Sequence, residues 1–99
     1  MGNRIGLVFK DDMEECDIIL HSHWMGRDLL KLAQQFYKEM PDHVRSEPCT
    51  YVTARFLLWL GTIFKHQINE LDIEVQTTDD DCEDNGVWVM DMTTGIIGD

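Results

Sequence analysis

The sequence predicts an α+β fold, in which a four-stranded, mostly antiparallel sheet carries two helices on one face. Residues 71–77, LDIEVQT, alternate apolar and polar side chains, a pattern typical of a strand with one solvated face. Residues 27–40 place apolar side chains three and four positions apart, which is typical of an amphipathic helix. Further apolar segments at residues 4–10 and 87–92 indicate strands near both ends. The expected order is therefore β-β-α-α-β-β.

The length of the chain fits one domain. Its 99 residues can enclose one hydrophobic core but not two, so we expect a single α+β domain over residues 1–99. Within it, residues 93–99 are expected to form a loose tail.

The first two strands are expected to form a hairpin. Residues 4–10 place Ile5, Leu7 and Phe9 on one face, and the polar connection DDMEEC at residues 11–16 is short enough to join antiparallel neighbours. The second strand begins at Asp17, and Gly26 gives the backbone a sharp exit into the first helix.

Two helices follow. The first ends at Pro41, and the second is expected to begin with Ser46 as its N-cap and Pro48 in its first turn. The apolar arc of the second helix, which includes Trp59, is wider than one sheet face requires. Burial inside the domain and a partner-facing surface both explain this width.

A second hairpin is expected near the end of the chain. Residues 78–85, TDDDCEDN, read as a solvated acidic loop, and the Asn85-Gly86 pair is a turn signal. The fourth strand then covers residues 87–92. The sequence does not indicate which strands are central.

The charge is unevenly distributed. The formal net charge is −11; residues 1–65 hold all eight Lys and Arg with nine acids, whereas residues 66–99 hold ten acids and neither Lys nor Arg. Direct nucleic-acid binding is disfavoured, because the phosphate backbone attracts positive charge. A basic protein surface is the favoured partner.

The acidic residues of the last third are the first candidate for a binding site. If the two hairpins lie side by side, their carboxylates form a broad negative face, and the alternative is a solvated surface that keeps the chain in solution. The expected partner-binding residues are Asp72, Glu74, Asp79, Asp80, Asp81, Glu83 and Asp84.

The second candidate site is the cluster of His21, His23 and Trp24. Alternate strand residues share a face, so the two imidazoles are expected on one side, an arrangement that suits a metal or small ligand. A metal needs at least one further ligand, which no neighbouring residue supplies. Structural roles for the two histidines and for Trp24 are the alternative.

The sequence favours a non-catalytic protein. Ser22 and its neighbouring histidines point to opposite strand faces, and no nucleophile elbow, P-loop or dinucleotide motif occurs, so we expect no catalytic residue and no cofactor. Three widely spaced cysteines indicate free thiols in a reducing cytoplasm. We expect neither a secretory signal nor a membrane span.

The segment S-H-W-x-G at residues 22–26 resembles a loose set of small phage and prokaryotic proteins that carry Y-S-H-W-G-G after an initial hairpin. The resemblance implies a phage or mobile-element setting and no catalytic residue. By size and charge, the chain is also similar to inhibitors of host defence nucleases, including anti-CRISPR proteins.

The leading hypothesis is therefore a non-catalytic inhibitor that mimics nucleic acid. It would press its acidic face against a basic, nucleic-acid-binding defence protein in the cytoplasm of a prokaryotic host. Two alternatives stay open. One is a metal or small-ligand site at His21, His23 and Trp24, with or without hydrolytic chemistry, and the other is a subunit that forms oligomers through its second helix.

Overall fold

The computed structural model describes residues 3–65, 67–77 and 84–98. They form five strands, three α-helices and one short 3₁₀ helix, which confirms the α+β class. The elements in order are β1 (Ile5–Lys10), β2 (Ile19–Ser22), α1 (Asp28–Glu39), α2 (Asp42–Arg45), α3 (Cys49–Ile63), η1 (Ile68–Glu70), β3 (Glu74–Gln76), β4 (Val87–Asp91) and β5 (Ile96–Gly98).

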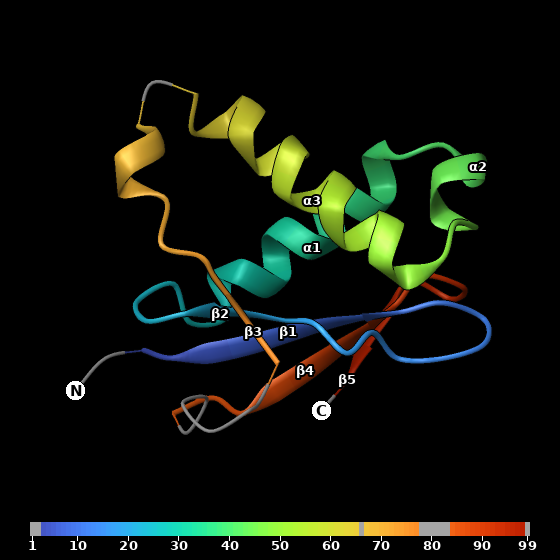
Figure 1. Ribbon diagram of the computed structural model, residues 1–99, viewed down its shortest axis with the longest axis horizontal. Helices are drawn as coiled ribbons and strands as arrows, with labels where there is room; N and C mark the ends of the chain where they lie inside the picture. Colours follow the sequence, from blue (N-terminus) through green and yellow to red (C-terminus); the bar gives the residue numbers. More distant parts are fainter. Residues whose placement is uncertain (1–2, 66, 78–83, 99) are drawn as a thin grey trace.

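The strands form one mixed sheet in the order β3-β2-β1-β4-β5, and the α-helices lie together on one side of it (Figure 1). The predicted first hairpin is confirmed, because β1 and β2 pair antiparallel with Leu7 opposite Leu20. On its other side β1 pairs in parallel with β4, and Phe9 faces Met90. β1 is therefore the central strand.

The predicted second hairpin is wrong, and the sheet has five strands where four were expected. The sheet is mostly antiparallel, as predicted, because three of its four strand pairs are antiparallel and only β1 and β4 pair in parallel. β3 pairs with β2 and β4 pairs with β1, so the two strands lie on opposite sides of the first hairpin. Burial explains the difference. Every residue from Ile5 to Phe9 is buried, and a strand covered on both faces is typically a central strand with a neighbour on each edge.

The Asn85-Gly86 signal is a turn, but it does not close a hairpin. The backbone N–H of Asn85 donates to the Arg4 carbonyl at 3.0 Å, and its side-chain amide donates to the same oxygen at 2.9 Å. Gly86 has a φ of 76°, which favours glycine, and its carbonyl accepts from the Gly6 N–H at 3.0 Å. These contacts lead the chain into β4 alongside β1.

The predicted loose tail is also wrong, because residues 96–98 form the edge strand β5. It pairs antiparallel with β4, with Ile97 opposite Met90. Gly95 makes the turn with a φ of 77°, and its N–H donates to the Asp91 carbonyl at 2.7 Å. The Thr93 N–H donates to the Asp91 carboxylate at 2.9 Å, which fixes the start of the turn.

The core lies between the sheet and helices α1 and α3, both of which the sequence predicts. Phe9, Phe36 and Phe56 meet edge to face, with ring centroids 5.1 to 6.0 Å apart. Trp59 packs against Phe36 and Phe56 and donates from its indole N–H to Glu39 at 3.1 Å. No helix among the described residues is long and apolar enough to cross a membrane.

The start of α3 corrects another expectation, because Ser46 is not its N-cap. Ser46 ends the short helix α2, and the residue before α3 is Pro48, which makes no side-chain cap. The cap comes instead from Asp11, whose carboxylate accepts from the Cys49 N–H at 2.8 Å. Asp11 also accepts from the N–H groups of Met13 and Glu14 at 2.7 and 2.8 Å. One carboxylate thus joins the β1–β2 connection to a helix terminus.

The pKa of Asp11 lies below its ordinary value of 3.8 because its carboxylate accepts backbone N–H groups. The N–H of Cys49 has the largest effect, followed by those of Met13 and Glu14. We therefore expect Asp11→Asn to lower the melting temperature at neutral pH by about 4–8 °C. A carboxyl with a depressed pKa stabilises the fold above its unfolded-state pKa. The difference in melting temperature between Asp11→Asn and wild type should accordingly become smaller as the pH falls from about 4 through the pKa of Asp11 in the folded state.

Thermal melts at pH 7 and at about pH 3 check this, with the exposed neighbour Asp12→Asn as the matched control. Equal melting temperatures for wild type and Asp11→Asn at pH 7 would contradict the capping role.

Candidate metal centre

His21 lies at the centre of the candidate site. Its neighbour Leu20 belongs to the core under the helices, so His21 projects from the opposite face of the sheet. On β1 its register partner is Gly6, which has no side chain on this face. The His21 side chain is fully buried, which fixes the ring in place.

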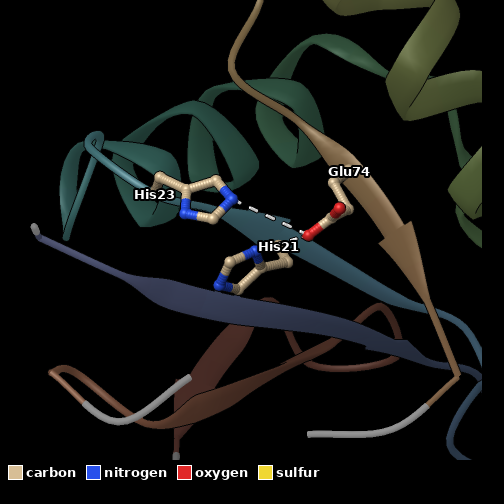
Figure 2. Close-up of side chains that lie close together, drawn as sticks. All are labelled: His21, His23 and Glu74. Carbon is tan, nitrogen blue, oxygen red and sulfur yellow. Dashed lines mark hydrogen bonds and ion pairs between the residues drawn. The ribbon is translucent and has the colours of Figure 1, made fainter. Parts of the chain in front are cut away.

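His23 follows the end of β2, and its imidazole lies beside that of His21 as the alternation predicts (Figure 2). The ring centroids are 4.6 Å apart, and the ring planes are inclined by 83°. Unlike His21, His23 is about half exposed, with 49% of its side-chain surface accessible. One imidazole is therefore fixed and the other can adjust.

The third residue is Glu74, from a segment that follows His23 by about fifty positions. In the β2–β3 ladder Glu74 is the register partner of His21, and directly opposed residues place their side chains on the same face. Glu74 Oε1 lies 3.1 Å from His21 Nδ1 and 3.8 Å from His23 Nε2 (Figure 2). The side-chain amide of Gln76 donates to the same oxygen at 2.6 Å.

This arrangement has the dimensions of a metal site. His21, His23 and Glu74 each offer one ligand atom, and the three atoms lie within 4.8 Å of one another. Ligands at about 2.0–2.1 Å from a tetrahedral ion lie roughly 3.4 Å apart, between the two measured distances to Glu74. To place all three ligand atoms at bonding distance from one ion, the side chains of His23 and Glu74 need small rotations, and both are about half exposed.

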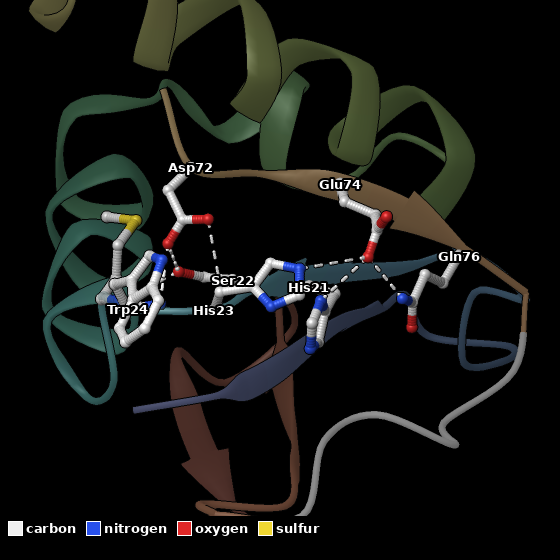
Figure 3. Close-up of polar contacts among 8 residues, drawn as sticks. His21, Ser22, His23, Trp24, Asp72, Glu74 and Gln76 are labelled. Carbon is white, nitrogen blue, oxygen red and sulfur yellow. Dashed lines mark hydrogen bonds and ion pairs between the residues drawn. The ribbon is translucent and has the colours of Figure 1, made fainter. Parts of the chain in front are cut away.

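The structure places Trp24, the third member of the predicted cluster, outside the ligand set. The residue is 68% exposed, and its backbone N–H donates to the Asp72 carboxylate at 2.7 Å (Figure 3). Gly26 has a φ of 55°, as its predicted role in the exit toward α1 requires.

The acidic residues predicted to bind a partner fall into three groups. Asp72 and Glu74 lie beside the histidines, so the structure brings these two of the seven acids to the second predicted site. Asp84 accepts from the Arg4 backbone N–H at 3.0 Å and pairs with its guanidinium, and these two contacts lower its pKa. The other four, Asp79, Asp80, Asp81 and Glu83, lie outside the described residues.

The alternation of covered and solvated side chains expected for residues 71–77 is only partly observed. Val75 was expected to be covered but is 57% exposed, because β3 is a three-residue edge strand with a neighbour on one side only. Asp72 was expected to be solvated but is partly buried and accepts three hydrogen bonds. Burial opposes ionisation of Asp72, yet hydrogen bonds from Ser22, Trp24 and His23 outweigh it and lower its pKa.

A second group of metal-ligating side chains, Asp11, Glu14 and Cys49, is a structural feature of the helix start. The Asp11 oxygens already accept three backbone N–H groups, as described above. Burial, followed by the neighbouring Cys16 and Asp11, raises the pKa of the Cys49 thiol well above its ordinary value. A protonated thiol is a poor metal ligand. Cys16 and Cys49 are free thiols, as predicted, and Cys82 lies outside the described residues.

The outer face of α3 is the surface on which the oligomer hypothesis depends. Tyr51 and Leu58 are exposed there, and with Ala54 and Arg55 they border a shallow hollow of about 450 Å³. Trp59 instead faces α1. Assembly through this helix stays a prediction.

Comparisons of the chain with models of known protein families, with curated proteins and with solved structures find no match. The resemblance to small phage proteins therefore stays a prediction, and the site is interpreted from its own geometry.

The different burial of the two histidines predicts different effects on stability. We expect His21→Ala to lower the free energy of unfolding by about 2 kcal/mol, since it empties a buried position and removes a hydrogen bond to Glu74. His23→Ala should change it by less than about 0.5 kcal/mol. Urea unfolding in the presence of a chelator measures both values, and equal losses in the two variants would contradict the geometry.

Proposed function

We propose that the protein binds a divalent transition-metal ion through His21, His23 and Glu74. The observation that carries the proposal is the register of β2 and β3, which sets a carboxylate directly opposite a buried imidazole and next to a second one. The sequence supplies only the two histidines as neighbours, and the sheet adds the third ligand.

The ligand set favours one class of ion. Two imidazole nitrogens and one carboxylate oxygen suit borderline ions such as Zn²⁺, Ni²⁺ and Co²⁺, whereas Ca²⁺ and Mg²⁺ prefer sites built from oxygen alone. Three protein ligands leave a fourth position for water or an exogenous group, as in catalytic zinc sites. Hydrolytic chemistry at that position stays open.

Metal binding would also stabilise the edge of the sheet. β3 is three residues long and pairs only with β2, and an ion held by His21 and Glu74 would join these two strands. Because a ligand that binds only the folded state stabilises it, the effect on unfolding should be measurable.

We expect Zn²⁺ at 100 times its dissociation constant to stabilise the fold by about 2.7 kcal/mol, which corresponds to a rise in melting temperature of about 10–20 °C for a domain of this size. The rise should disappear in His23→Ala and Glu74→Gln, which change the two exposed ligands and spare the buried His21. Differential scanning fluorimetry with and without metal measures it.

His43→Ala is the matched control, because His43 is an exposed histidine on α2, away from the site. A shift that persists in His23→Ala and Glu74→Gln but is lost in His43→Ala would refute the proposed site.

The second candidate is the acidic inhibitor, which the concentration of charge favours: ten acids and no Lys or Arg in residues 66–99. We propose as this alternative that the acidic residues bind a basic, nucleic-acid-binding protein in the cytoplasm of a prokaryotic host. Such a contact forms faster at low salt and weakens as salt screens it.

A tagged pull-down from prokaryotic lysate tests this alternative. We expect a nucleic-acid-binding protein to be captured at low salt, to be released at high salt, and to be lost when Asp79, Asp80, Asp81 and Asp84 are changed to Asn. Capture that neither salt nor these substitutions reduce would exclude nucleic-acid mimicry.

A further inference from the structure

Asp72 connects the segment before β3 to the end of β2, and Figure 3 shows it next to Ser22 and Trp24. One carboxylate oxygen accepts from the Ser22 hydroxyl and from the Trp24 N–H, each at 2.7 Å. The other oxygen accepts from the His23 N–H at 3.3 Å. A single carboxylate therefore contacts three consecutive residues, with His23 in the middle.

Ser22 extends these contacts into the following turn. Its Oγ donates to Asp72 and accepts from the Met25 N–H at 3.0 Å. On the other side of the same turn, the Asn3 N–H donates to the His23 carbonyl at 2.9 Å. The backbone of His23 is thus held at its N–H by Asp72 and at its carbonyl by Asn3. The side chain of His23, by contrast, is half exposed and has few constraints of its own.

We infer that Asp72 is the positioning residue of the metal centre. This inference rests on the proposed metal-binding function. Asp72 does not bind the ion, but it fixes the backbone from which the exposed ligand His23 projects toward Glu74. His21 needs no such support, because its ring is buried.

The placement of Asp72 couples its role to that of Glu74. Asp72 and Glu74 lie two positions apart on the segment that pairs with β2. When this segment pairs, Glu74 comes to lie opposite His21 and Asp72 contacts the His23 backbone at the same time. Outer contacts that orient ligands typically change metal affinity by about 10- to 100-fold when removed. Asp72 is expected to act within this range.

The test compares Co²⁺ binding by wild type, Asp72→Asn and Ser22→Ala, using titration for the dissociation constant and visible absorption for the coordination geometry. Asn matches Asp in shape but replaces one accepting oxygen by an NH₂ donor, so it cannot accept from Ser22 and Trp24 on one oxygen and from the His23 N–H on the other. Asp91→Asn is the matched control, since Asp91 also accepts a backbone N–H and pairs with Lys10, but on β4.

We expect Asp72→Asn to raise the dissociation constant about 10- to 100-fold and to change the Co²⁺ spectrum. Ser22→Ala, which removes one contact to Asp72, should raise the dissociation constant by a smaller factor. It replaces Asp72→Asn as the test variant if Asp72→Asn does not fold. Asp91→Asn should bind Co²⁺ as the wild type does, even if it melts at a lower temperature.

Two other results separate the inference from the proposed function. If wild type binds Co²⁺ and Asp72→Asn binds it with the same affinity and spectrum, Asp72 has no positioning role and the metal site stands. If wild type does not bind Co²⁺, the proposed function fails and the inference fails with it.

Discussion

The burial of β1 on both faces constrains the whole sheet. Its residues Ile5 to Phe9 are all buried, and a strand of this kind is typically central in its sheet, with a neighbour on each edge. β2 occupies one edge and β4 the other, which leaves β3 to pair with the far edge of β2. That pairing brings Glu74 opposite His21. The geometry of the candidate metal centre therefore depends on the position of β1 in the sheet.

Sequence patterns predict the elements better than their pairing. Helices α1 and α3 and the first hairpin follow from local periodicity and a short connection, and the structure confirms them. The pairing of β4 with β1 instead joins distant residues, as in the register pair of Val8 and Val89 and in the contacts of Asn85 with Arg4. The Asp11 cap likewise joins residues 38 positions apart. Such long-range contacts leave no periodic signal in the chain.

The candidate site divides in the same way. The pair His21 and His23 can be identified from the sequence, because their spacing places them on one strand face. From the sequence, Glu74 is one of many acids, and its position as a candidate third ligand depends on the β2–β3 register. Asp72 was expected to be solvated, whereas it binds the end of β2. Two hypotheses that the sequence kept apart, an acidic face and a histidine cluster, therefore share residues in space.

If Glu74 is a ligand and Asp72 supports one, these two carboxylates are less available to a basic partner than the sequence suggests. The most direct measurement is an anomalous-difference map from zinc-soaked crystals of the wild-type protein. We expect one dominant peak about 2.0–2.1 Å from nitrogens of both His21 and His23 and a similar distance from Glu74. A map with zinc bound elsewhere and no peak between these three side chains would contradict the metal centre.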